Sequence, residues 1–188
     1  MKYNLKPSSP SVGRGLYYLF IAEVLSFLSL INILGWVVSL ASAMISIYAL
    51  YVMMKAEPRY RRAFYCTGAS VAAAVLYSYS LLSGLPAVVC TLLQCSIYLT
   101  NLLMVLFICK TTGELVKPTS PSLAERSEMV WKLFIFSDLL SMARTLLADA
   151  PETIFTAPWM AIASVGVAIA AGLLYLSFIW ESQKLLQK

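Results

Sequence analysis

Long runs of apolar residues alternate with short polar stretches along this chain. The first run covers 15–54, where Glu23 is the only charged side chain. The hydrocarbon core of a bilayer is about 30 Å thick and takes about 20 helical residues to cross. The run therefore predicts a hairpin of two transmembrane helices, about 16–33 and 36–54, that reverses near Gly35. One long bent helix lying partly along the membrane surface is the alternative.

Later apolar runs also have the length of a membrane span. They predict four more helices, at about 62–82, 86–109, 129–148 and 158–180. Short turns separate the third helix from the fourth and the fifth from the sixth. The run at 129–148 contains Asp138 and Arg144, and whether it fully crosses the membrane stays open.

The polar stretches complete the domain organisation. Residues 1–14 predict a flexible cytoplasmic tail, and 15–188 predict a single six-helix transmembrane domain. The longest polar interval, 110–128, predicts a cytoplasmic linker that begins where the fourth helix ends.

The end of this linker carries a signal for the start of a helix. Ser122 and Glu125 have the spacing of a capping box, in which the two side chains accept hydrogen bonds from free backbone N–H groups. The fifth helix is therefore expected to begin near Leu123.

Basic residues are concentrated in alternate polar stretches. If the N-terminus lies inside, every Lys and Arg except Arg144 falls on the inner side. The inner loops of membrane proteins carry an excess of Lys and Arg. The charge pattern therefore predicts six spans arranged as three hairpins, with both termini in the cytoplasm. This all-α architecture suits a multi-pass protein of a cell membrane, in particular a bacterial inner membrane.

Composition agrees with a membrane-embedded fold. Of the 188 residues, 60% are hydrophobic and 12% are charged, and the mean hydropathy is +0.79. A soluble domain of this size could not bury so much apolar surface. The net charge of +5 lies in short clusters and not on a basic face interleaved with aromatics, so nucleic acid is not an expected partner.

The sequence contains few of the residues that usually perform catalysis or bind metals. Histidine is absent, which removes the commonest general base and metal ligand. The cysteines, Cys66, Cys90, Cys95 and Cys109, lie in apolar runs without a CxxC spacing. No glycine-rich phosphate loop is present. The sequence predicts no metal, disulfide or cofactor and disfavours an enzyme.

Ionisable groups remain inside the predicted spans. Glu23 and Asp138 lie at similar expected depths in helices one and five, and Arg144 lies further along helix five. Such groups are costly in lipid and usually face the interior of a bundle. One hypothesis is that Glu23 and Asp138 line a polar cavity of a proton- or cation-coupled carrier. The alternative is local pairing of each acid, with Arg144 directed toward Asp149.

Helix four carries a polar stripe. Gln94, Tyr98 and Asn101 follow i, i+4, i+7 spacing and share one face. This stripe could bind a small ligand or supply hydrogen bonds between helices.

Small residues at a spacing of four favour close helix packing. Ser164, Ala168 and Gly172 show this spacing in helix six. The same pattern could also form the face of a homo-oligomer.

Two functions fit these features best. The first is a small transport component that binds a small molecule or ion within the helix bundle. The second is a non-catalytic assembly or regulatory subunit that docks a protein or anionic lipid through a basic cytoplasmic face. That face contains Lys55, Arg59, Arg61 and Arg62. A lipid-directed enzyme that uses Glu23 and Asp138 as acid and base is a third possibility.

The predicted layout resembles one known class of membrane protein. Chain length, six spans and cytoplasmic termini are similar to those of the substrate-binding subunits of energy-coupling-factor vitamin importers. The resemblance includes no shared motif, and the first outer turn is too short to form a lid over a vitamin site. It therefore implies a layout and not membership of that family.

Overall fold

The computed structural model describes residues 10–29, 35–147 and 158–187, and these residues contain helices and no strand. A 3₁₀ turn, η1 (Pro58–Tyr60), precedes the third helix. The α-helices are α1 (Pro10–Ser29), α2 (Gly35–Ala56), α3 (Arg61–Leu82), α4 (Ala87–Val116), α5 (Pro121–Leu146) and α6 (Pro158–Leu186). The all-α prediction with six helices is confirmed.

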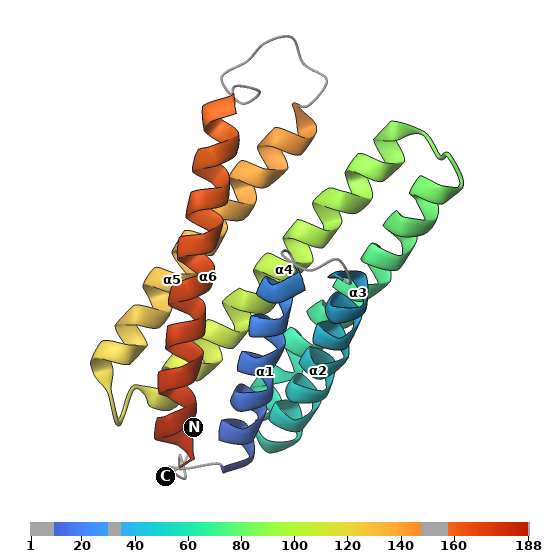
Figure 1. Ribbon diagram of the computed structural model, residues 1–188. Helices are drawn as coiled ribbons and strands as arrows, with labels where there is room; N and C mark the ends of the chain where they lie inside the picture. The colour runs from blue at the N-terminus through green and yellow to red at the C-terminus, as the bar shows by residue number, and fades with distance from the viewer. Residues whose placement is uncertain (1–9, 30–34, 148–157, 188) are drawn as a thin grey trace.

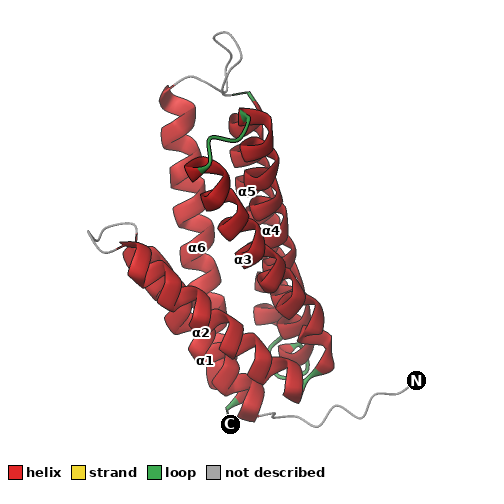
Figure 2. Cartoon of the chain, turned by 90° about the vertical axis from the view of Figure 1, so that its right-hand side faces the viewer, coloured by secondary structure: helices red, strands yellow, loops and turns green. Residues whose placement is uncertain are grey.

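Consecutive helices run antiparallel and form three pairs, α1 with α2, α3 with α4 and α5 with α6, and α5 also packs closely against α4 (Figure 1). All three pairs meet at one end of the molecule, which we call the base (Figure 1). The base holds η1, the 117–120 turn and the described ends of the chain. Away from the base the pairs diverge, and α1 with α2 leans away from the other helices (Figure 2). The alternative of one long bent helix over 15–54 is wrong, because α1 and α2 pack against each other.

Buried side chains concentrate in the half of the molecule next to the base. Leu16, Leu50, Ile108 and Phe178 are fully buried there and come from four different helices. Toward the diverging ends the large apolar side chains are exposed, as Leu82 and Ile162 show. The molecule is therefore well packed at one end and open at the other.

Two glycines allow this close packing. A Cβ at Gly15 would meet Met53 and the carbonyl oxygen of Ala49, so the absence of a side chain lets α1 approach α2 closely. A Cβ at Gly113 would meet the side chain of Ser127 in the same way, which brings α4 against α5.

Helix ends at the base differ from those that the sequence predicted. α1 begins at Pro10, so residues 10–14 belong to a helix and not to a flexible tail, because Val12 is buried in the core. Residues 1–9 of the predicted tail lie outside the described residues. Most of the predicted linker, 110–128, is also helical, since α4 continues to Val116.

The predicted capping box is not formed. α5 begins at Pro121, with Ser120 as its N-cap residue and no side-chain capping hydrogen bond. Proline supplies the favourable backbone angle at the first helical position, so the helix starts two residues before Leu123. The turn before α4 and the start of α6 at Pro158 agree with the sequence, whereas 30–34 and 148–157 lie outside the described residues.

Five helices in the described part of the chain are long and apolar enough to cross a membrane. They are Pro10–Ser29, Val37–Ala56, Pro58–Leu82, Ala87–Val116 and Ile162–Leu186. α5 does not meet this criterion within the described part of the chain, in agreement with the polar residues noted in its sequence. Several apolar helices of this length fit a multi-pass membrane protein.

Candidate functional site: a polar cavity where the helix pairs diverge

A cavity of about 250 Å³ lies next to the packed core. Val105 and Tyr175 belong to both the core and the cavity wall. Every one of the six α-helices contributes to the wall, so the site exists only when the three pairs are assembled. The lining residues are Glu23, Ser26, Ser42, Ala43, Ser46, Thr67, Ser70, Val71, Asn101, Met104, Val105, Phe134 and Tyr175.

Glu23 is the only acidic or basic side chain among Asp, Glu, Lys and Arg in this wall. It lies on α1, is half-buried, and has no hydrogen bond or ion pair with any described residue. A carboxylate inside a membrane-spanning segment usually has a partner, because an unpaired charge there costs several kcal/mol. The carboxylate therefore remains available to a bound group.

Serine and threonine hydroxyls share the rest of the wall with apolar side chains such as Val71 and Phe134, and several of these hydroxyls are held in place by hydrogen bonds. Ser42 donates to the carbonyl oxygen of Ala22 at 2.8 Å, and this bond joins α2 to α1. Ser70 donates to Oδ1 of Asn101 at 2.7 Å, and this bond joins α3 to α4. Because these hydroxyls act as donors, their oxygen lone pairs stay free to accept.

Tyr175 adds an unsatisfied group to this wall. Its hydroxyl is buried and has no hydrogen-bond partner among the described residues. Buried polar groups without a partner are uncommon and are costly to the fold.

The arrangement is suited to binding a small cation or a small polar cation-bearing molecule. One carboxylate and several hydroxyl oxygens are the donor set that hard cations and ammonium groups prefer. The volume is slightly below the usual range for drug-sized ligands, about 300–1,000 Å³. No group of three His, Cys, Asp or Glu side chains gathers in the described ranges, so a multi-carboxylate or thiolate metal site is not among the sites they form.

Some of the site residues predicted from the sequence line the cavity, and others lie elsewhere. Glu23 and Asn101 line it, whereas Gln94 donates to the Tyr98 hydroxyl at 3.3 Å further along α4. Asp138 is half-buried on α5 but is not part of the cavity wall. The shared cavity proposed for the two acids therefore contains Glu23 alone.

Arg144 connects two helices near the open end. Its Nη1 donates to the Ser164 hydroxyl at 2.9 Å and links α5 to α6. The predicted approach to Asp149 lies outside the described residues. Gly172, from the same small-residue stripe as Ser164, contacts the ring of Phe27 on α1. Two members of the stripe thus pack within the bundle, Ala168 is exposed, and its use in a homo-oligomer stays a prediction.

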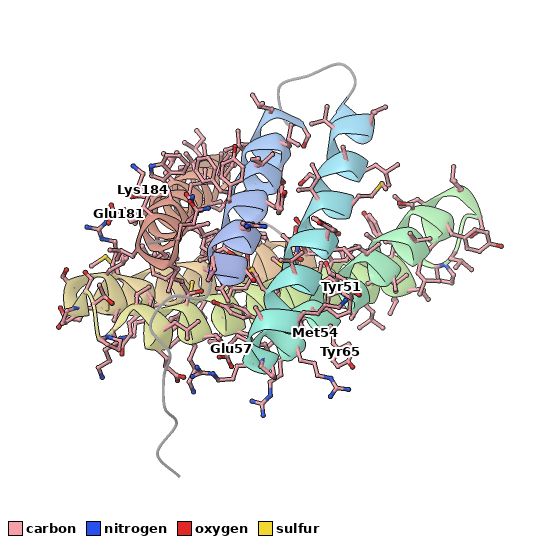
Figure 3. The ribbon with its side chains drawn as sticks, turned by 90° about the horizontal axis from the view of Figure 1, so that it is seen from below. Tyr51, Met54, Glu57, Tyr65, Glu181 and Lys184 are labelled. Atoms are coloured by element: carbon pink, nitrogen blue, oxygen red, sulfur yellow. The ribbon has the colours of Figure 1, made fainter. Side chains whose placement is uncertain are left out.

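The basic residues predicted for docking have two different surroundings at the base. Arg59 forms ion pairs with Glu57 at 2.9 Å and Glu114 at 2.8 Å, so it ties η1 to α4. The hydrogen bond from Arg59 lowers the pKa of the Glu57 carboxyl. Lys55, Arg61 and Arg62 have no carboxylate partner among the described residues, and they lie over the rings of Tyr51, Tyr65 and Phe107. Figure 3 shows Glu57 with Tyr51 and Tyr65 at the base, where α2 ends and α3 begins.

Sequence reasoning missed most of the hydroxyl groups around Glu23. Ser42 and Ser46 are four residues apart on α2, a spacing that could have marked them as one polar face. Tyr175 carries no such signal, because it is one apolar-flanked aromatic residue in a long apolar helix.

Comparison with known proteins yields no relative. No family model, no curated protein and no solved structure matches this chain.

Proposed function

We propose that the protein is a small membrane transport component that binds a small cation or cationic molecule in the cavity around Glu23. The observation that carries this proposal is a carboxylate without a partner among the described residues, in the wall of a cavity about 250 Å³ in volume. Intramembrane acids that face a cavity are typical of ion and substrate pathways.

The openness of the bundle supports transport over a purely structural role. The cavity lies where the helix pairs begin to diverge, and α1 with α2 stands away from the other helices above the base (Figure 2). Rigid-body rocking of one pair against the others would change access to the cavity, as alternating access requires. A ligand held between the pairs would favour the conformation in which they close on it.

The proposal includes a threading of the chain through the membrane. All six helices cross, α5 included, and the base lies in the cytoplasm of a cell with a bacterial-type inner membrane. This orientation is supported by the basic residues at the base, among them Lys55, Arg61, Lys110 and Lys117. α5 packs against both α4 and α6, which is the position of a spanning helix.

Ligand-dependent thermal stability of the purified protein tests the proposal. Sodium, methylammonium and choline chloride are added to separate samples in detergent, with ionic strength held constant. A ligand that binds the folded state raises its stability in proportion to the logarithm of ligand concentration above Kd. We expect one of the three to raise the unfolding temperature of the natural protein, and the same ion to be taken up by proteoliposomes.

Two acid variants identify the site. Glu23→Gln keeps the shape of the side chain and removes its charge, so it should abolish both the stabilisation and the uptake. Asp138→Asn is the matched control, because this acid is also half-buried but lies outside the cavity wall. Stabilisation that survives Glu23→Gln, or no effect of any of the three cations, would contradict the proposal.

The base offers a second candidate function, as a surface that binds an anionic partner. Lys55 and Arg61 favour it, because both are exposed and neither pairs with a carboxylate in the described ranges. A role as an assembly or regulatory subunit would use this surface and would not require the cavity.

A further inference from the structure

Aromatic rings join α2 to α3 at the corner of the base. The ring of Tyr51 on α2 lies 6.4 Å from that of Phe64 on α3, and Phe64 lies 6.0 Å from Tyr65. Tyr51 and Tyr65 are 40% and 56% exposed, so the outer edge of this strip is open. Tyrosine at such a position is typical of the level of the lipid headgroups.

A cation lies over each exposed ring of this strip. Nζ of Lys55 is 4.5 Å from the ring centroid of Tyr51, and Cζ of Arg61 is 5.4 Å from that of Tyr65. Nε of Arg61 also donates to the Tyr65 hydroxyl at 2.9 Å, which fixes the guanidinium group. The remaining N–H groups of both side chains are free to donate to an anion.

An apolar stripe leads from this corner along α2. Leu40, Met44, Tyr48 and Tyr51 are all exposed and recur at helical spacing, so they lie on one face of the helix. The stripe runs through a helix that is apolar enough to cross a membrane and ends one turn before Lys55. A positively charged end and a long apolar stripe together match the shape of a phospholipid.

From this arrangement we infer that the corner site, formed by Lys55, Arg61, Tyr51, Phe64 and Tyr65, binds the phosphate of an anionic glycerophospholipid. Lys55 and Arg61 hold the headgroup, and an acyl chain follows the stripe on α2. A water-soluble protein partner would use the cations but would leave the apolar stripe without a role. The inference does not depend on the cavity around Glu23.

Two other cations at the base also lie over aromatic rings, Arg62 over that of Phe107 and Lys184 over that of Trp180. Neither of these rings adjoins a second ring with a cation over it in the described ranges, so the paired arrangement at the corner differs from both.

Arg59 is neutralised by Glu57 and Glu114. Lys110 and Lys117 are exposed and have no carboxylate partner in the part of the chain described, but neither lies over an aromatic ring there. Removal of these two lysines is therefore a control with the same loss of charge.

Native mass spectrometry of the full chain tests the inference. The protein is purified in a neutral detergent and titrated with phosphatidylglycerol or, separately, with zwitterionic phosphatidylcholine. Each Lys or Arg near an anionic lipid surface contributes enough attraction for about a fivefold change in affinity. We expect the double variant Lys55→Gln, Arg61→Gln to bind phosphatidylglycerol about 25-fold more weakly, and its binding of phosphatidylcholine to stay unchanged.

The control variant separates a site from diffuse attraction. Lys110→Gln with Lys117→Gln should bind phosphatidylglycerol within about twofold of the natural protein, although by charge alone it would lose as much as the corner variant. Equal loss in both variants, or no loss in the corner variant, would overturn the inference. Unchanged lipid binding with loss of a copurifying protein would assign the corner to a protein partner instead. Circular dichroism of each variant shows that it has folded.

Discussion

The Tyr60 hydroxyl and the Thr112 hydroxyl lie 2.8 Å apart in the core of the base. Both side chains have no exposed surface. This hydrogen bond connects the turn between α2 and α3 to the last turns of α4, which are 52 residues away in sequence. It therefore fixes the first two helix pairs to each other at the end where all pairs meet.

Removing the Tyr60 hydroxyl should measurably weaken the base. Tyr60→Phe leaves the Thr112 hydroxyl buried without this partner, which costs about 1–3 kcal/mol in the free energy of unfolding. Tyr79→Phe is the control, since Tyr79 is 65% exposed and such surface changes stay within about 0.5 kcal/mol. Equilibrium unfolding in mixed micelles measures both. Equal effects in the two variants would mean that the buried bond contributes nothing.

Glycine substitutions should have opposite effects at two positions. Gly15→Ala places a Cβ against Met53 and the Ala49 carbonyl, and such overpacking costs about 1–3 kcal/mol. Gly68→Ala meets no atom within 4 Å and should stabilise α3 by about 0.5–1 kcal/mol, because glycine is unfavourable inside a helix. Thermal unfolding of the two variants compares them directly. A loss of stability in Gly68→Ala would show that α3 has a close neighbour in the membrane.

Helix number and type could be predicted from the sequence, but helix ends at the base could not. Apolar runs of about 20 residues identify spanning helices wherever they occur. The sequence around Lys110 turns polar, which favoured a linker. In the structure Thr111, Thr112 and Gly113 are buried, Thr112 against Tyr60 and Gly113 against Ser127, so α4 continues through them. Tertiary contacts of this kind leave no periodic pattern.

The candidate site was predictable only in part. Glu23 was identified because a charged residue inside an apolar run is rare, and Asn101 because it completes a polar stripe. Which face of each helix meets the others depends on close approaches such as that at Gly15, which fix helix rotation. The sequence gives no information on that rotation. Asp138 was therefore predicted to share a cavity with Glu23, although it is not part of the cavity wall in the structure.

Acidic pH should weaken the ion pair between Glu57 and Arg59 at the base. The pKa of Glu57 in the folded protein is below the ordinary value of 4.5, because Arg59 donates hydrogen bonds to the carboxylate. The ion pair therefore contributes stability above about pH 4.5, and this contribution is lost as the pH falls through the lowered pKa. Unfolding temperatures measured between pH 7 and pH 3 should converge for the natural protein and Glu57→Gln. The matched control is Glu128→Gln, which removes an exposed pair within one helix and should show no such convergence. A constant difference between the natural protein and Glu57→Gln across this range would contradict the assignment.

Cysteine labelling should place the base inside the cell and show that α5 crosses the membrane. In a background without the four natural cysteines, we expect an impermeant maleimide to label Ser83→Cys in intact cells and Thr119→Cys only after permeabilisation. Ser83 ends the α3 side of an exposed turn at the open end, and Thr119 lies in the turn at the base.

A third variant, Glu152→Cys, tests whether α5 crosses the membrane. Because α5 starts at the base and α6 returns to it (Figure 1), a spanning α5 exposes residue 152 on the same side as residue 83. Labelling of Thr119→Cys in intact cells would reverse the orientation, and protection of Glu152→Cys with labelling of Ser83→Cys would show that α5 stays on the inner side. If α5 stays on the inner side, Phe134 cannot line the cavity. Loss of cation binding in Glu23→Gln is therefore expected only together with labelling of Glu152→Cys in intact cells.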